Sequence, residues 1–245
     1  MLNNQTAEKL SKLKMPAMAE CYHRLSETPD AAALSHDDFL GMLVDAEWTA
    51  RSNKRIKRLL RQADLRENAS IEDIEYHPDR MLNRLEILQL SECSWVESRR
   101  NLLITGATGA GKTYLACALG NAACRRNYSV RYYRMPRVLT DLAVARMDGS
   151  YNRYLATLKK CQILIIDDWG LAPLSPAEGR DVLEVIEDRM LTGSLVISSQ
   201  LPISDWHAVF EDPTIADACM DRLIHNSYRI EIGGETMRAR HSKSI

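Results

Sequence analysis

The sequence lacks any continuous apolar run of the length that crosses a membrane, which is about 18 residues. Residues 1–15 also lack the apolar core of a secretory signal, because Asn, Gln, Glu and Lys are spread through them. From these two absences we expect neither a transmembrane segment nor a secretory signal. We therefore expect a cytoplasmic protein with no membrane partner.

The sequence also lacks paired cysteines and an excess of charge of either sign. Its six cysteines include no CxxC pair and have no His at ligand spacing, so reduced thiols are expected rather than a disulfide scaffold or zinc site. The 32 Lys and Arg residues nearly balance the 33 Asp and Glu residues, which leaves a formal net charge of −1. Attraction to nucleic acid must therefore come from local clusters of basic residues.

The chain has the composition of a folded globular protein, with 45% hydrophobic and 27% charged residues in 245 positions. This length favours a main domain with a smaller one. Residues 1–68 carry helical periodicity and are predicted to form a helical N-terminal domain that binds DNA or a partner. Residues 69–100 are expected to connect it to a second domain at 101–245.

A basic helix that includes residues 51–66 is predicted near the end of the N-terminal domain. Residues 35–38 fit a capping box that starts a helix running towards Leu60. Between Arg51 and Arg66 there are seven basic residues against the single acid Asp64. Steps of three and four residues place five of the basic residues on one helical face, as candidate DNA contacts: Arg51, Lys54, Arg55, Arg58 and Arg61. The alternative is an exposed face that is only solvated or paired with acids elsewhere.

From residue 101 onward, short apolar runs alternate with helical stretches. The predicted strands are 102–104, 130–133, 163–166, 195–197 and 229–232. The predicted helices between and around them are 112–126, 136–147, 151–160, 176–191 and 215–225. This alternation predicts an α/β fold, with a parallel sheet flanked by helices on both faces.

The first predicted strand leads into a loop that matches G-x-x-x-x-G-K-[ST] and opens a helix, which is the context of a phosphate-binding loop. The candidate nucleotide-binding residues are Gly106, Ala107, Thr108, Gly109, Ala110, Gly111, Lys112, Thr113 and Tyr114. The glycines allow backbone N–H groups to point at phosphate oxygens. Lys112 would reach the outer phosphates of ATP, and the Thr113 hydroxyl would ligate Mg²⁺.

Two acids follow the apolar strand at 163–166. Asp167 is the candidate partner for Mg²⁺, held through water, and Asp168 is the candidate to polarise the attacking water. The Asp168 side chain is one methylene shorter than that of the Glu usual at this position in ATPases with a phosphate-binding loop. We therefore expect ATP hydrolysis to be weak or to depend on a partner. The alternative is that a strand simply ends in acids because it ends at solvent.

Other candidates for catalysis follow later strands and helices. Gln200, or Ser199 in its place, is a candidate to orient water near the γ-phosphate. One of three arginines, Arg222, Arg238 or Arg240, is a candidate to reach the nucleotide of a neighbouring subunit.

Several runs together resemble the IstB family: 166–174, 199–202, 206–207, 212–218, 221–223, 225–226 and 234–238. Members of this family are AAA+ ATPase helpers of insertion-sequence transposition, similar to the DnaC and DnaI helicase loaders. The resemblance implies that residues 106–113 are the Walker A loop and that Asp167 and Asp168 are Walker B. It also implies Gln200 as first sensor, Arg222 as arginine finger and Arg238 as second sensor. The chain departs from many AAA+ proteins after residue 232, where little length remains for a helical lid.

The resemblance implies a homo-oligomer, joined through AAA+ interfaces, that assembles on duplex DNA and stimulates a partner transposase. The main alternative is a replicative helicase loader of the DnaC/DnaI type. A small-metabolite kinase with a P-loop would need an acceptor-binding lid, which the sequence does not show. A scaffold that binds ATP without turnover is the fourth possibility.

Overall fold

The computed structural model describes residues 2–28 and 34–234, and these form two compact units, residues 1–58 and 59–245. The predicted domain limits at 68 and 100 stay predictions. Within the described ranges, every helix is too short or too polar to pass through a membrane.

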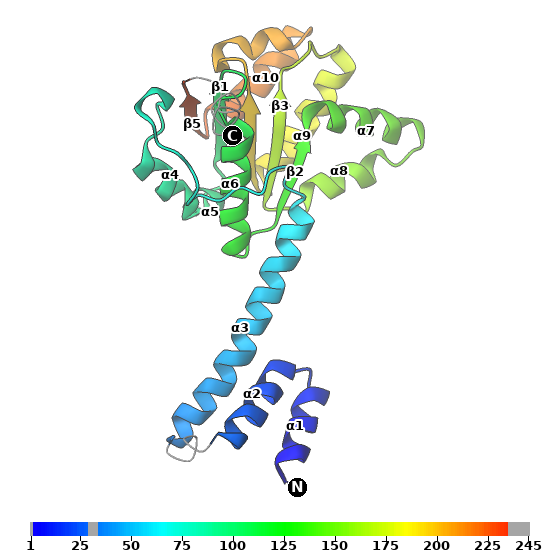
Figure 1. Cartoon of the computed structure of the whole chain (residues 1–245). Helices are drawn as coiled ribbons and strands as arrows, with labels where there is room; N and C mark the ends of the chain where they lie inside the picture. Colours follow the sequence, from blue (N-terminus) through cyan, green and yellow to red (C-terminus); the bar gives the residue numbers. More distant parts are fainter. Residues whose placement is uncertain (1, 29–33, 235–245) are drawn as a thin grey trace, which may run out of the picture. The chain divides into compact units, whose positions relative to one another are not determined.

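The first unit is helical. It contains α1 (Leu2–Lys12), α2 (Pro16–Glu27) and most of α3 (His36–Ala63) (Figure 1). Pro16 opens α2 at its first position, where a missing N–H costs no hydrogen bond. A small core of buried side chains joins α2 to α3: Cys21, Leu25 and Leu43, with Met18, Tyr22, Phe39 and Ala46 packed around them.

One buried carboxylate fixes the start of α2. Glu47 on α3 accepts hydrogen bonds from the backbone N–H groups of Ala17 and Met18, at 3.0 and 3.1 Å. These are donors that the first turn of a helix leaves without partners. Arg51 completes the arrangement with Nε 2.7 Å from Glu47 Oε1. The interaction with Arg51 is the largest cause that lowers the pKa of Glu47, so the carboxylate is charged near neutral pH.

The second unit is built on a five-stranded parallel sheet in the order β2-β3-β4-β1-β5. Its strands are β1 (Asn101–Gly106), β2 (Val130–Arg134), β3 (Ile163–Trp169), β4 (Ser194–Ser199) and β5 (Ser227–Ile232). The predicted α/β fold with a parallel sheet is confirmed. The strand at 163–166 is longer than predicted, because β3 continues through Asp167 and Asp168 to Trp169, with a shift in its register against β4 after Ile166.

Helices cover both faces of the sheet, as predicted (Figure 1). Alternate residues of each strand enter one of two cores: Ile165 of β3 faces the first, and Leu164 and Ile166 face the second. The first core is covered by α4 (Arg84–Ser91), α5 (Ser94–Glu97) and α6 (Lys112–Arg125). The second is covered by α7 (Met135–Met147), α8 (Tyr151–Lys159), α9 (Pro176–Met190) and α10 (Pro213–Ile224). Short 3-10 turns lie at Pro78–Arg80, Ile203–Asp205 and His207–Val209.

The four tryptophans differ sharply in exposure. Trp95, Trp169 and Trp206 are almost fully buried in the second unit. The rings of Trp169 and Trp206 lie 5.4 Å apart between centroids, beside Phe210. Trp48, on α3 in the first unit, is 75% exposed.

A buried arginine joins α9 to the loops below the sheet. Arg189 is 1% exposed, and its guanidinium donates to the carbonyl oxygens of Cys161, Gln162 and Ser194, among others. Cys161 and Gln162 lie between α8 and β3, and Ser194 is the first residue of β4. The guanidinium therefore links α9 by hydrogen bonds to the segments that lead into two strands of the sheet.

We expect Arg189→Ala to lower the free energy of unfolding by about 3–5 kcal/mol, because it removes a fully buried side chain together with its several hydrogen bonds to backbone carbonyl oxygens. Urea denaturation of the two proteins measures this change. Arg180→Ala, on the exposed face of the same helix, is the control and should shift stability by no more than about 0.5 kcal/mol. Equal stability of the two variants would contradict the assigned role of Arg189.

Candidate active site

The glycine-rich loop lies between the end of β1 and the start of α6, as its motif predicts. Gly111 immediately precedes α6 and has a φ of +94°, a conformation that favours glycine. A Cβ atom at Gly111 would lie 2.9 Å from the guanidinium of Arg80, and one at Gly106 would overlap the carbonyl oxygen of Ile232. These two positions therefore require glycine both for backbone conformation and for space.

Two side chains predicted to act on phosphate lie at this loop. Lys112 is the first residue of α6, is largely buried, and donates from Nζ to the carbonyl oxygen of Ala107 at 2.8 Å. Gln200 follows β4 directly, and its side-chain oxygen accepts from the Thr108 hydroxyl at 2.6 Å. Because β4 lies between β1 and β3, Gln200 reaches the loop from the neighbouring strand, where the sequence placed it.

The buried carboxylate of Asp167 accepts hydrogen bonds from hydroxyl groups on three different elements. Its Oδ2 accepts from Thr113 of α6 at 2.9 Å and from Tyr132 of β2 at 2.6 Å. Its Oδ1 accepts from Ser198 of β4. Asp167 is only 1% exposed, so these hydrogen bonds replace water around the charge. The sequence predicted Thr113 and Asp167 as partners of one Mg²⁺ ion, with Asp167 held through water, and the structure brings the two side chains together. Tyr132 and Ser198 were not predicted.

Burial is the largest cause that raises the pKa of the Tyr132 hydroxyl, and the hydrogen bond to Asp167 adds to it. The phenol therefore stays protonated and donates to the carboxylate. Tyr132 and Ser198 lie on the strands either side of β3, where an alternating apolar pattern gives no sign of their role.

Two arginines face the acid pair. Arg134 at the end of β2 places Nε 2.6 Å from Asp168 Oδ2. Arg66 places Nη1 3.8 Å from Asp167 Oδ2 and 3.9 Å from Asp168 Oδ2. The basic run at 51–66 was expected to belong to one helix, but α3 ends at Ala63 and Arg66 reaches the acids. The two carboxylates at this edge of the sheet are therefore faced by two guanidinium groups of opposite charge.

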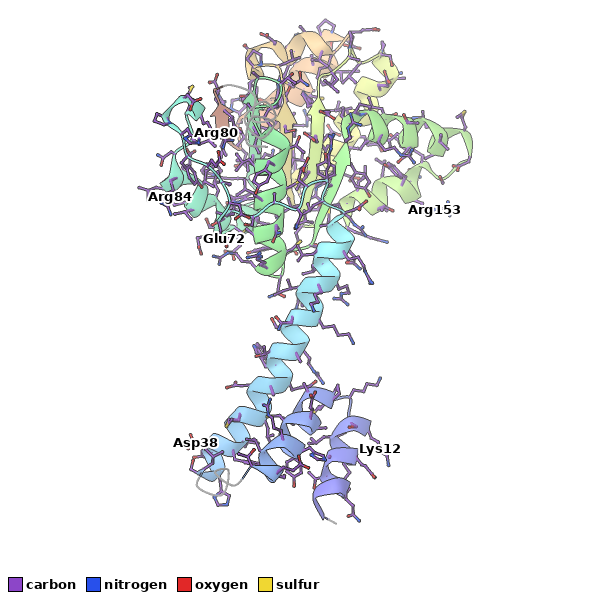
Figure 2. The ribbon with its side chains drawn as sticks, in the orientation of Figure 1. Lys12, Asp38, Glu72, Arg80, Arg84 and Arg153 are labelled. Carbon is purple, nitrogen blue, oxygen red and sulfur yellow. The ribbon has the colours of Figure 1, made fainter. Side chains whose placement is uncertain are left out.

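A hollow of about 430 Å³ lies beside the glycine-rich loop. One wall contains Gly109 and residues 111–114, including the predicted Tyr114, and the other contains residues of the segment 73–80. Arg80 fastens that segment to the loop, donating to the carbonyl oxygens of Glu75 at 2.6 Å and Ala110 at 3.0 Å (Figure 2). No motif or pattern in the sequence indicated this wall, and residues 69–100 were expected only to connect the two domains.

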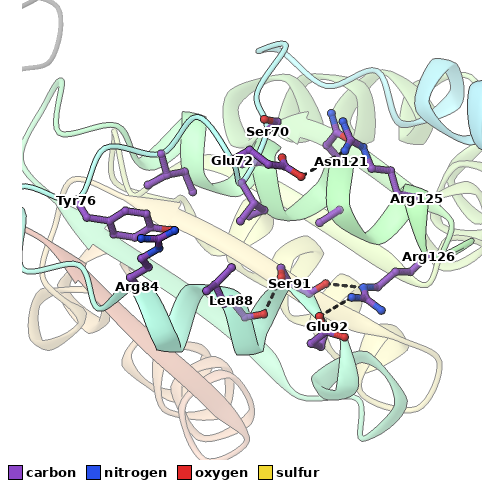
Figure 3. A pocket seen from close by; sticks show the side chains of 14 residues that line it. Ser70, Glu72, Tyr76, Arg84, Leu88, Ser91, Glu92, Asn121, Arg125 and Arg126 are labelled. Atoms are coloured by element: carbon purple, nitrogen blue, oxygen red, sulfur yellow. Dashed lines mark hydrogen bonds and ion pairs between the residues drawn. The ribbon is translucent and has the colours of Figure 1, made fainter.

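A second, larger hollow of about 680 Å³ lies between α4, the segment 70–76 and α6 (Figure 3). Its charged side chains bind one another: Arg126 lies 2.6 Å from Glu92, and Arg125 lies 3.5 Å from Glu72. Its lining includes none of the loop residues 106–113. This groove therefore does not belong to the candidate phosphate site.

The predicted arginine finger lies on α10, away from this cluster of contacts. Arg222 donates to the carbonyl oxygen of Ala218 at 2.9 Å, and its Nη2 lies 2.8 Å from Glu187 on α9. Its side chain is 30% exposed. Arg238, the predicted second sensor, and Arg240 lie outside the described residues. Their assignments remain predictions.

The predicted DNA-binding residues of α3 have different surroundings. Arg51 is held by Glu47 and also donates to the carbonyl oxygen of Lys14 at 2.8 Å. The other four are exposed: Lys54, Arg55, Arg58 and Arg61. The first three of these belong to the first unit, and Arg61 belongs to the second.

The residues at the loop fit a magnesium ion. The Thr113 hydroxyl and the Asp167 carboxylate supply two hard oxygen donors that already lie 2.9 Å apart. The described residues include no cluster of three or more His, Cys, Asp or Glu side chains that could hold a metal alone. Mg²⁺ commonly takes only one or two carboxylates and completes its shell with water and phosphate oxygens, so this donor set suits it.

The order of the strands, the loop between β1 and α6, and the acids on β3 define a P-loop fold of the AAA+ type. The solved structure of DnaI superposes with a TM-score of 0.60 and 23% identity, covering 72% of this chain and 93% of that one. The DnaC helicase loader superposes with a TM-score of 0.57 and 18% identity, covering 67% and 97%. DnaA from Aquifex aeolicus superposes with a TM-score of 0.59 and 18% identity, covering 74% of this chain and 55% of that one. These similarities show the fold.

Sequence similarity is more specific. Residues 8–245 match the family described as IstB-like ATP binding protein. An insertion-sequence ATP-binding protein of Sinorhizobium fredii is 43% identical over 97% of each chain. The ATP-binding protein of insertion sequence IS21 from Pseudomonas aeruginosa is 28% identical over 96% of this chain and 88% of its own length. The chain belongs to the IstB-like family of insertion-sequence proteins, and the resemblance predicted from its sequence is confirmed.

We expect Lys112→Ala to weaken binding of a fluorescent ATP analogue at least tenfold, because Lys112 is the cation that the loop offers to phosphate. Titration of the analogue at fixed Mg²⁺ measures this change, and circular dichroism checks the fold. Lys160→Ala removes an exposed cation outside the loop and should leave affinity unchanged. Retained affinity in the Lys112 variant would show that the phosphates bind elsewhere.

Proposed function

We propose that this protein binds ATP with Mg²⁺ and hydrolyses it to ADP and phosphate. The observation that carries the proposal is the contact between Thr113, at the end of the phosphate loop, and the buried Asp167, at 2.9 Å. A hydroxyl and a carboxylate, both oxygen donors suited to Mg²⁺, thus lie together where the loop meets the sheet edge, which supports the proposal. Ligands of parallel α/β folds bind at this edge.

Each residue has a distinct part in the proposed reaction. The loop N–H groups and Lys112 hold the phosphates, while Asp168 and Gln200 orient water towards the γ-phosphorus. A bond forms from the water oxygen to phosphorus as a proton of that water passes to Asp168, the bond from phosphorus to the β,γ-bridging oxygen breaks, and ADP leaves with that oxygen. Thr113 and Asp167 would hold Mg²⁺, which would supply positive charge to offset that of the phosphates.

The contacts of Asp168 favour slow turnover. Its carboxylate oxygen Oδ2 lies 2.6 Å from Arg134 Nε, so this oxygen is engaged by a guanidinium and is not free to orient water. A partner that moves Arg134 away would free the oxygen for that task. This supports the expectation that hydrolysis is weak in the isolated protein and depends on a partner.

We expect Asp167→Ala to retain binding of the ATP analogue within about tenfold while losing Mg²⁺-dependent phosphate release. Phosphate release and nucleotide binding are measured on the same preparation. Asp45→Ala, an exposed acid on α3, is the control and should not change either quantity. Hydrolysis at the unchanged rate in the Asp167 variant would show that this carboxylate is misassigned.

We further propose that the protein is an ATP-dependent regulator of transposition that assembles on duplex DNA and stimulates a partner transposase. Two observations support this: relatives of high identity are named as insertion-sequence proteins, and α3 exposes a cluster of cations. Lys54, Arg55 and Arg58 repel one another at helical spacing, at a cost of a few tenths of a kcal/mol per pair, and phosphates would relieve that cost.

We expect reversal of Lys54, Arg55 and Arg58 to Glu to weaken binding to all duplex sequences alike and to flatten its salt dependence. Each phosphate contact contributes about −0.9 to the slope of log affinity against log salt, so the loss of three contacts should change the slope by about 2–3. Salt titrations of DNA binding by fluorescence anisotropy measure it.

The matched control reverses Lys9, Lys12 and Lys14, which also lie in the first unit and give the same change in charge. This control variant should change the slope of log DNA affinity against log salt much less than the α3 variant does. If the α3 variant bound DNA as the unaltered protein does, the DNA contact would lie elsewhere. The helix would then be a candidate surface for a protein partner, as in a helicase loader.

We also propose that Arg222 acts on the nucleotide of a neighbouring subunit. The proposal is supported by the contacts of its guanidinium among the described residues: it pairs with Glu187 on α9 at 2.8 Å and donates to Ala218, and it makes no hydrogen bond or ion pair with residues 106–113 of its own chain. We expect a mixture of Arg222→Ala and Lys112→Ala proteins to recover part of the ATPase activity that each lacks, because mixed interfaces contain one intact site. Absence of recovery in mixtures shown to co-assemble would make Arg222 a structural residue.

A further inference from the structure

Arg66 connects the acid pair to the last turn of α3. Its guanidinium faces Asp167 at 3.8 Å and Asp168 at 3.9 Å. A hydrogen bond with Tyr132 is the largest cause that raises the pKa of Arg66, and the charges of the two acids add to it. No motif of the sequence includes this arginine, which comes three residues after the end of α3 at Ala63.

Neighbouring residues of β2 hold both this arginine and the end of the helix. Arg131 donates to the carbonyl oxygen of Gln62, in the last turn of α3, at 2.5 Å. The next residue, Tyr132, donates to Asp167 and interacts with Arg66. Ala63 is fully buried in the first core of the second unit. The end of α3 is therefore packed against the strand that supports the acid pair.

Arg66 and a metal ion would address the same oxygen. Asp167 Oδ2 accepts from Thr113 and Tyr132 and faces Arg66, so a cation ligated by Thr113 and Asp167 would lie close to the guanidinium. Two positive groups so close together repel each other, even where water partly screens them. The Asp167 side chain is 2% exposed and that of Arg66 is 41% exposed, and the 3.8 Å between Nη1 and Oδ2 is an ion-pair distance rather than a short hydrogen bond.

We propose that Arg66 is a positioning residue that competes with Mg²⁺ for Asp167 and thereby couples the nucleotide site to helix α3. The inference rests on the proposed nucleotide-binding function and specifies how that site is regulated. Metal binding displaces the guanidinium from Asp167 towards Asp168 and the phosphates. The displacement pulls on residues 64–66 and changes how the last turn of α3 is held.

Competition between Arg66 and Mg²⁺ predicts a change in the Mg²⁺ requirement that a purely structural arginine would not produce. Removing the positive charge should let Mg²⁺ bind at lower concentration, whereas loss of a structural contact should only lower stability. We expect Arg66→Gln, which keeps most of the side-chain length, to reduce the Mg²⁺ concentration for half-maximal binding of the ATP analogue about three- to tenfold. Arg66→Ala serves as a second variant and should shift in the same direction.

The matched control is Arg153→Ala on α8, which removes an exposed charge of the same kind from another part of the second unit (Figure 2). Its Mg²⁺ requirement should equal that of the unaltered protein. An unchanged or increased Mg²⁺ requirement in both Arg66 variants, with folding confirmed by circular dichroism, would overturn the competition. If the unaltered protein itself bound no nucleotide, the proposed function would fail before this inference was reached.

Coupling is measured by the ratio of duplex DNA affinities in the presence of ATP and ADP. The unaltered protein should bind duplex DNA with different affinities in the presence of ATP and of ADP. For Arg66→Gln, the ratio of these two DNA affinities should move towards one. Arg153→Ala should retain the ratio of the unaltered protein. Equal affinities in ATP and ADP for the unaltered protein, or an unchanged ratio in the Arg66 variant, would overturn the coupling.

Discussion

The burial of one carboxylate, that of Asp167, organises the whole phosphate-binding edge of this fold. A charge that is 1% exposed must be compensated by hydrogen bonds, and here these come from α6, β2 and β4. Each donor fixes the position of its own element relative to β3. The carboxylate is therefore both a candidate metal ligand and the point at which three parts of the sheet edge are joined, and the two roles share the same oxygens.

The sequence predicts those parts of the site that lie within one continuous segment. The glycine-rich loop, Thr113 and the acids on β3 follow from spacing, because a strand, a loop and a helix in sequence place their residues together. Gln200 was also predicted, since the carboxyl ends of parallel strands meet at one edge. The five strands and the helices between them emerge from apolar runs, with ends that differ by a few residues.

The missed residues come from lateral contacts. Tyr132, Ser198 and Arg134 reach the acids from neighbouring strands, and their roles depend on the strand order β2-β3-β4, which periodicity does not encode. Arg66 looked like one more cation of a basic helix. Arg80 lies in a segment that appeared to be only a connection. In these cases the charge or hydroxyl is visible in the sequence, but its partner is decided by tertiary packing.

The unequal burial of the tryptophans separates the two units spectroscopically. Trp48 in the first unit is 75% exposed, while the other three belong to the second unit and are almost fully buried. Emission from a solvated indole lies at longer wavelength than emission from an indole in an apolar core. A soluble quencher therefore reaches the helical unit selectively, and the remaining emission comes from around the sheet, where Trp169 directly follows the acid pair. The unmodified chain thus carries separate optical reporters for its two units: one exposed tryptophan in the first and three buried ones in the second.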